Sequence, residues 1–214
     1  LSTAVIVLVI TCMMVFIVHP KTAPFIALVV LGIIALVVGA TILGSMIQAG
    51  DLGDNFRLRR IIVWLDPKKH ASDYGYQVVQ GLYAIGSGGF FGKGLGNSTQ
   101  KRLIPEVQND MILSVICEEL GVFGAIMVLV LFGLLLYRLM VIAQNAPDMY
   151  GALIASGIFS HIALQVFLNV AVVINLIPNT GITLPFISYG GTSLLFLMLE
   201  MGVALGISRK IKMQ

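Results

Sequence analysis

Five long stretches of apolar residues constrain the fold of this sequence more than any other feature. Each is long enough to cross a bilayer core of about 30 Å as a helix, which takes about 20 residues. The stretches run over residues 2–18, 22–47, 111–138, 149–176 and 189–207. Only 11% of the residues are charged, against about 25% in soluble domains, which excludes a soluble enzyme. The sequence predicts an all-α integral membrane protein, a polytopic bundle with five transmembrane helices.

The basic residues near the short connections set the topology of such a bundle. Lys21, Arg138 and a C-terminal cluster around Arg209 lie on one side, which we expect to be cytoplasmic. The long polar segment 48–109 then forms a large extracellular loop. The chain starts on apolar residues with neither a Met nor a basic leader, so we expect it to be the later part of a longer protein.

A glycine-rich stretch, residues 86–96, lies within the predicted loop. It fails the tests for a nucleotide site, because no strand precedes it and no Ser or Thr follows Gly92-Lys93. We interpret it as a turn at the membrane surface, with Phe90 and Phe91 as interfacial anchors. The three His are too scattered for a zinc site, and nothing in the composition indicates a nucleic-acid partner.

Several ionisable residues lie within or next to the predicted helices. Glu118, Glu119, His161 and Glu200 fall at membrane depth, where a charge is costly and needs either a buried partner or a functional role such as a proton relay. Asp110 lies where the basic loop meets the third helix. Its chemistry alone favours a helix cap, because negative charge is stabilising at a helix N-terminus.

Several ordered motifs strongly resemble the SEDS family, the FtsW/RodA/SpoVE cell-wall proteins. They are Phe56–Ile61 with Asp66-Pro67, Tyr76–Gln80, Gly92–Lys101, Pro105-Glu106 with Asp110 and Glu118–Gly121, and Asn169 with Pro178–Ser193. Residues 92–101 and 183–185 look more like FtsW or SpoVE, whereas residues 84–89 look more like RodA. The family fold has about ten membrane helices with a large loop after the seventh, so the resemblance implies that this chain matches the last five.

The resemblance implies a peptidoglycan glycosyltransferase at the outer face of the bacterial cytoplasmic membrane. Such proteins polymerise lipid II and release undecaprenyl pyrophosphate, in cell division or cell-shape maintenance. They work beside a class B penicillin-binding protein and other membrane proteins of the divisome or elongasome. Two alternatives stay open: a lipid II flippase that uses Glu118, Glu119 and Glu200, and a non-catalytic scaffold for a penicillin-binding protein.

The same resemblance implies roles for particular residues. Asp110 matches the family's essential loop aspartate and would be the general base, although Gln108-Asn109 stand before it where the family commonly has His-Thr. The leaving pyrophosphate would be held by basic side chains, for which attraction to anionic lipid headgroups is the alternative role: Arg57, Arg60 and Lys101. Residues that could bind sugar or position the loop are Gln77, Gln80 and Glu106. A divalent cation, Mg or Mn, could assist at the pyrophosphate, but no ligand cluster indicates one.

Overall fold

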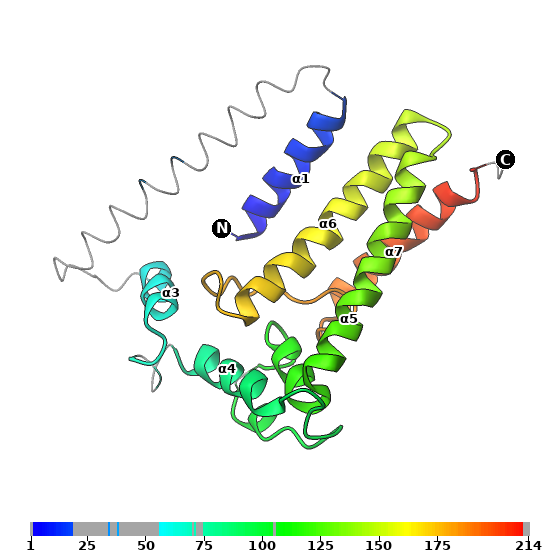
Figure 1. Cartoon of the computed structure of the whole chain (residues 1–214). Helices are drawn as coiled ribbons and strands as arrows, with labels where there is room; N and C mark the ends of the chain where they lie inside the picture. Colours follow the sequence, from blue (N-terminus) through cyan, green and yellow to red (C-terminus); the bar gives the residue numbers. More distant parts are fainter. Residues whose placement is uncertain are drawn as a thin grey trace.

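The computed structural model describes residues 2–18, 34, 38, 56–69, 71, 75–104 and 106–211. Every regular element in these ranges is a helix (Figure 1). The elements are α1 (Ser2–Val18), α3 (Phe56–Leu65), α4 (Tyr76–Gly88), the 3-10 helix η1 (Gln100–Arg102), α5 (Ile112–Gln144), α6 (Met149–Val173) and α7 (Gly191–Ser208). The predicted all-α class is confirmed.

Three of the described helices, α5, α6 and α7, are long and apolar enough to cross a membrane. In α1, the apolar helical part is shorter and runs over Ile6–Ile17. The predicted spans 2–18, 149–176 and 189–207 agree with α1, α6 and α7 to within three residues, whereas the predicted span 111–138 continues to Gln144. The predicted span 22–47 lies outside the described residues apart from 34 and 38, so the number of five spans stays a prediction.

The helices form a bundle whose two ends differ in character. Helices α5 and α6 lie side by side, α1 packs on α6, and α7 contacts both α5 and α6. Figure 1 shows α3, α4 and the loops near them gathered at one end, with the α5–α6 turn and the C-terminal end of α7 at the opposite end. The ends of α5 and α7, which bear Arg138 and Arg209, therefore share one end of the bundle.

The segment predicted as a loop, residues 48–109, contains two helices and a helical turn, which corrects the prediction. Helix α4 buries Val78, Val79 and Ala84 and packs against α5. Isolated helices of 10 to 13 residues are marginal in water, so α3 and α4 depend on contacts with the bundle. Helix α3 is held by reciprocal hydrogen bonds: Trp64 Nε1 donates to Asn175 O at 3.0 Å, and Asn175 Nδ2 donates to Trp64 O at 3.4 Å.

Helix α5 is interrupted at Gly121, whose φ of 70° lies in the left-handed region. The neighbouring loop, residues 89–94, supplies the hydrogen bonds that the interruption removes. Lys93 N and Gly94 N donate to Glu118 O and Glu119 O, both at 2.9 Å. In return, Val122 N donates to Gly89 O at 3.0 Å and Phe123 N to Phe90 O at 3.2 Å.

The interpretation of residues 86–96 as a turn at the membrane surface was incomplete, because residues 86–88 belong to α4 and residues 89–94 hydrogen-bond to α5. A Cβ at Gly121 would overlap the carbonyl oxygen of Phe90, so the close approach requires glycine as well as the positive φ. Phe90 and Phe91 remain exposed on the outside of the loop, as interfacial anchors would be. The glycine-rich loop and the helix interruption form one structural unit, the Gly121 junction.

Candidate active site

Asp110 lies two residues before α5, at the end of the bundle where α4 packs. Its side chain is largely buried, with 9% exposed, and its Oδ1 accepts a hydrogen bond from Gln77 Nε2 on α4 at 2.9 Å. The N-cap of α5 is Met111, which makes no side-chain capping bond. The interpretation of Asp110 as a helix cap is therefore wrong, because its carboxylate is held by α4 instead.

Two further residues, Asn179 and Arg60, are connected to Gln77 and Asp110. Asn179 belongs to the Pro178–Ser193 segment. Asn179 Nδ2 donates to Gln77 Oε1 at 3.5 Å, and its Oδ1 accepts from Gly181 N at 2.9 Å. Arg60 Nη1 on α3 donates to Asn179 O at 3.2 Å. Three residues predicted for the site, Arg60, Gln77 and Asp110, are thus joined by Asn179, to which the sequence had assigned no role.

Helix α6 fixes the backbone at Asp110. Asn169, which is fully buried, donates from Nδ2 to Asp110 O at 2.9 Å and to Ile182 O at 2.8 Å. Tyr189 N also donates to Gln108 O at 2.8 Å. The sequence signal that could have indicated this bridge is the carboxamide of Asn169 within an otherwise apolar helix. We call Arg60, Gln77, Asp110, Asn169 and Asn179 the Asp110 network.

The remaining predicted site residues have no described contact with this network. Gln80 follows Gln77 on α4 and is partly buried. Glu106, at a φ of 48°, is exposed and accepts from Asn109 Nδ2 at 3.0 Å. Lys101 is exposed, and the side chain of Arg57 lies outside the described part of the structure. No described contact joins these residues to Asp110, and their roles in binding stay predictions.

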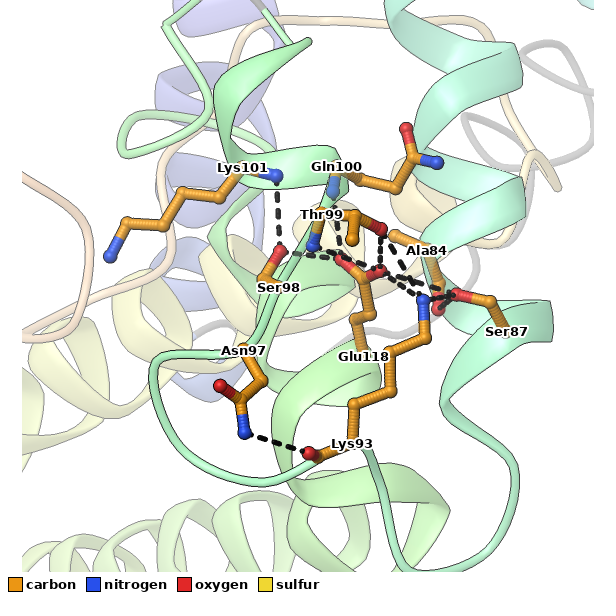
Figure 2. A network of polar contacts seen from close by, with 9 residues as sticks. All are labelled: Ala84, Ser87, Lys93, Asn97, Ser98, Thr99, Gln100, Lys101 and Glu118. Carbon is orange, nitrogen blue, oxygen red and sulfur yellow. Dashed lines mark hydrogen bonds and ion pairs between the residues drawn. The ribbon is translucent and has the colours of Figure 1, made fainter.

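A second polar cluster surrounds Glu118, whose carboxylate is fully buried (Figure 2). It accepts from Lys93 Nζ at 2.6 Å, Ser98 Oγ at 2.5 Å and Thr99 Oγ1 at 2.8 Å. Weaker bonds come from Ser87 Oγ and from the backbone N–H groups of Thr99 and Gln100, at 3.2 to 3.3 Å. A buried charge is tolerated only when paired and hydrogen-bonded, and Glu118 meets both conditions.

The Glu118 cluster organises the loop that leads to Asp110. Lys93 Nζ also donates to Ser87 Oγ at 2.8 Å, and Lys101 N donates to Ser98 Oγ at 3.0 Å. Figure 2 shows the Lys101 side chain extending away from Glu118, so only its backbone takes part in the cluster. The sequence left two interpretations of Glu118 open, a buried charge with a partner or a functional role such as a proton relay. The structure supports the buried charge with a partner.

Two of the other ionisable residues predicted at membrane depth, His161 and Glu200, also form a pair. His161 Nδ1 on α6 lies 3.0 Å from both carboxylate oxygens of Glu200 on α7. The pair links two membrane helices and lies apart from the Asp110 network along α6. Among the described residues, no group of three or more His, Cys, Asp or Glu could hold a metal ion. A ligand set for a divalent cation is therefore not found in that part of the chain.

The fold and the site together define a multi-pass membrane protein with a polar network at one end of its helices. The chain belongs to the FtsW/RodA/SpoVE family, because the family model, described as "Cell cycle protein", matches residues 1–213. It is 44% identical over 201 residues to stage V sporulation protein E of Bacillus subtilis (strain 168). That alignment covers 93% of this chain and 52% of the relative.

Two further comparisons agree. A probable peptidoglycan glycosyltransferase FtsW of Coxiella burnetii (strain RSA 493 / Nine Mile phase I) is 40% identical over 210 residues, covering 96% of this chain and 54% of the relative. A solved structure, "Structural coordination of polymerization and crosslinking by a peptidoglycan synthase complex", matches with a TM-score of 0.71 and 27% identity. That match covers 99% of this chain and 56% of the other, so the chain spans about half the length of these relatives.

Proposed function

We propose that this protein is a peptidoglycan glycosyltransferase that polymerises lipid II, with Asp110 as the general base. The observation that carries the proposal is the Asp110 network, in which a buried carboxylate is held at its side chain by Gln77 and at its backbone by Asn169. A relative named as a probable peptidoglycan glycosyltransferase FtsW, from Coxiella burnetii, supports the same activity.

The reaction that fits a single held carboxylate is a one-step inversion. The 4-hydroxyl of the acceptor sugar attacks the anomeric carbon of the donor, and a new C–O bond forms as the bond to pyrophosphate breaks. The hydroxyl proton passes to the Asp110 carboxylate, and undecaprenyl pyrophosphate leaves. A positioned general base contributes typically about 10²- to 10⁴-fold to a rate.

Negative charge develops on the leaving pyrophosphate, and fixed cations stabilise it where it forms. Arg60 is the best supported of the three proposed residues, because its bond to Asn179 O ties its guanidinium to the Asp110 network. Arg57 precedes it by three residues on α3, a spacing that puts both residues on one helix face. Lys101 completes the set. Gln80 and Glu106 are proposed to contact sugar or to position the loop.

The chemistry also sets the proposed orientation and partners. We place the end with α3, α4 and Asp110 at the outer face of the bacterial cytoplasmic membrane and the C-terminus in the cytoplasm. A class B penicillin-binding protein is the proposed partner, with other membrane proteins of the division or elongation machinery, and the synthase complex among the structural matches supports such an assembly. A divalent cation, Mg or Mn, would neutralise charge on the pyrophosphate, but no step is assigned to it.

The test compares glycan polymerisation by the wild type and by Asp110→Asn. The natural full-length protein would be purified in complex with its penicillin-binding protein and given lipid II. The products would then be separated on a gel. We expect polymer from the wild type and none from Asp110→Asn. The matched control is Asp148→Asn, the same change at the exposed α5–α6 turn, which should retain activity. Equal polymer from wild type and Asp110→Asn would contradict the role of Asp110.

The flippase and scaffold alternatives make different predictions. A flippase would rely on the intramembrane carboxylates, yet Glu118 is saturated by loop donors and Glu200 is paired with His161. Translocation of labelled lipid II into vesicles should then fail in Glu200→Gln and survive in Asp110→Asn. A scaffold would bind its partner equally well with either change and would yield no polymer even from the wild type.

A further inference from the structure

We infer that Gln77 positions Asp110 for proton abstraction, and that Asn179 fixes the Gln77 carboxamide in the orientation this requires. The inference rests on the proposed function and assigns two residues a role within it. Gln77 Nε2 is 2.9 Å from Asp110 Oδ1, and Gln77 Oε1 is 3.5 Å from Asn179 Nδ2. Both residues act through the carboxylate of Asp110 and are positioning residues.

The orientation of both carboxamides follows from a backbone group. A Gln or Asn amide is assigned from its hydrogen bonds, because its oxygen and nitrogen look alike. Gly181 N can only donate, so the atom of Asn179 that it contacts at 2.9 Å must be Oδ1. Asn179 Nδ2 then faces Gln77 and meets Oε1, which leaves Gln77 Nε2 to face Asp110.

This relay matters because the two ends of a carboxamide have opposite effects on a carboxylate. A donor N–H stabilises the ionised form, which a general base needs, whereas an oxygen would repel it. The hydrogen bond from Gln77 to Oδ1 also fixes the rotation of the carboxylate group. The other oxygen, Oδ2, is the one that we assign to receive the proton. Arg60 anchors the far end of the relay through Asn179 O at 3.2 Å.

Three other ionisable groups on or near the packed elements have partners of their own. Glu106 accepts from Asn109, Glu118 pairs with Lys93, and His161 pairs with Glu200. Arg60 is the charged side chain that described bonds link to Asp110, by way of Asn179 and Gln77. A new charge at Gln77 would therefore act on Asp110 more directly than on any of these groups.

The first experiment measures kcat against pH for lipid II polymerisation by Gln77→Glu in the complex with the penicillin-binding protein. Two adjacent carboxylates raise the pKa of one of them, so we expect the acid limb of the profile to move up by about one pH unit or more. The matched control is Gln144→Glu, the same change at the far end of α5, which should leave the profile unmoved.

The second experiment is a double-mutant cycle with Gln77→Ala and Asn179→Ala. We expect each single variant to lower kcat by about tenfold with little change in KM, and the double variant to be no slower than Gln77→Ala alone, because residues in one network are not additive. A raised KM with an unmoved acid limb would overturn the inference and assign Gln77 to substrate binding. Additive losses in kcat would overturn the relay through Asn179.

Different results would contradict the proposed function and the inference about Gln77 and Asn179. An inactive wild-type complex would contradict the proposed function together with the inference. An active wild type, with Asp110→Asn inactive and the acid limb of Gln77→Glu unmoved, would contradict the inference alone. Gln77→Glu nearly preserves the side-chain size, and coelution of its complex with the wild type on a sizing column shows that the variant is folded.

Discussion

The Lys93 ammonium and the Glu118 carboxylate form an ion pair at 2.6 Å whose two partners differ sharply in exposure. The Glu118 side chain is fully buried, whereas one third of the Lys93 side chain (33%) remains accessible. Lys93 can therefore turn to solvent if its partner is lost, but Glu118 cannot. This asymmetry determines which substitution the protein tolerates.

Lys93→Met should destabilise the protein more than Glu118→Gln. Removing one partner of a buried pair costs about 3 to 5 kcal/mol when the remaining charge stays buried, which is the situation of Glu118. The Ser98 and Thr99 hydroxyls contact different oxygens of Glu118. In Glu118→Gln the amide oxygen still accepts from one hydroxyl, and the amide N–H donates to the other, because a hydroxyl can also accept. Thermal unfolding midpoints in detergent check the order. A Glu118→Gln variant that unfolds at a lower temperature than Lys93→Met would contradict it.

Gly121→Ala should weaken the Gly121 junction. The alanine would have to hold a φ of 70°, and its Cβ would overlap Phe90 O. Holding such a backbone conformation costs a non-glycine residue about 1 to 3 kcal/mol. Gly133→Ala is the matched control, because a Cβ built there meets open space beyond the backbone of its own helix. Thermal unfolding should separate the two variants clearly, and equal midpoints would argue against the junction.

Asn169→Leu should impair activity and stability together. The substitution leaves Asp110 O and Ile182 O without their buried donor, and each unsatisfied buried group costs about 1 to 3 kcal/mol. The loop 178–190 and the start of α5 would then no longer be tied to α6. The measurements are the unfolding midpoint and the yield of glycan polymer. As a control, Asn145→Ala at the end of α5 should change both little, as most surface substitutions do.

Asn175→Ala should detach the indole of Trp64 from the end of α6. Trp64 is the single tryptophan of this chain. Its indole Nε1 donates to Asn175 O, and Asn175 Nδ2 donates to the backbone oxygen of Trp64. The backbone carbonyl persists in the variant, but Asn175 also holds a left-handed φ of 58°, which alanine adopts poorly. We expect a red shift of tryptophan fluorescence, measured against Trp64→Phe as the blank. An unchanged spectrum would show that α3 docks without this contact.

Hydropathy predicted the described helices α1, α6 and α7 well because the bilayer imposes a length on each apolar stretch. The bounds of α1, α6 and α7 followed from composition alone, to within three residues. The helices α3 and α4 did not, since short helices in a polar segment depend on what they pack against. The interruption at Gly121 was also hidden, because the loop that satisfies its backbone is more than 25 residues away in sequence.

Three members of the Asp110 network were selected from the sequence, but their arrangement was not. Arg60, Gln77 and Asp110 were chosen for their chemistry and through resemblance, and the structure joins them through Asn179. Sequence could not show that Asn179 would be the connection, since its contacts with Gln77 and Arg60 span 102 and 119 positions. Glu118 and Glu119 look equivalent in the sequence, yet only Glu118 is enclosed by loop donors.

The Gly121 junction divides α5 into two mechanical parts. The first part, up to Leu120, is fastened by backbone hydrogen bonds to the glycine-rich loop, and Asp110 stands at its start. The second part continues across the apolar region and is connected to the first through a glycine rather than through continuous helical bonds. The same loop also holds the second part, through Val122 N and Phe123 N. A displacement of the loop would therefore reach both parts of α5 at once, so that the loop, rather than continuous helical bonds, couples Asp110 to the apolar part of the helix.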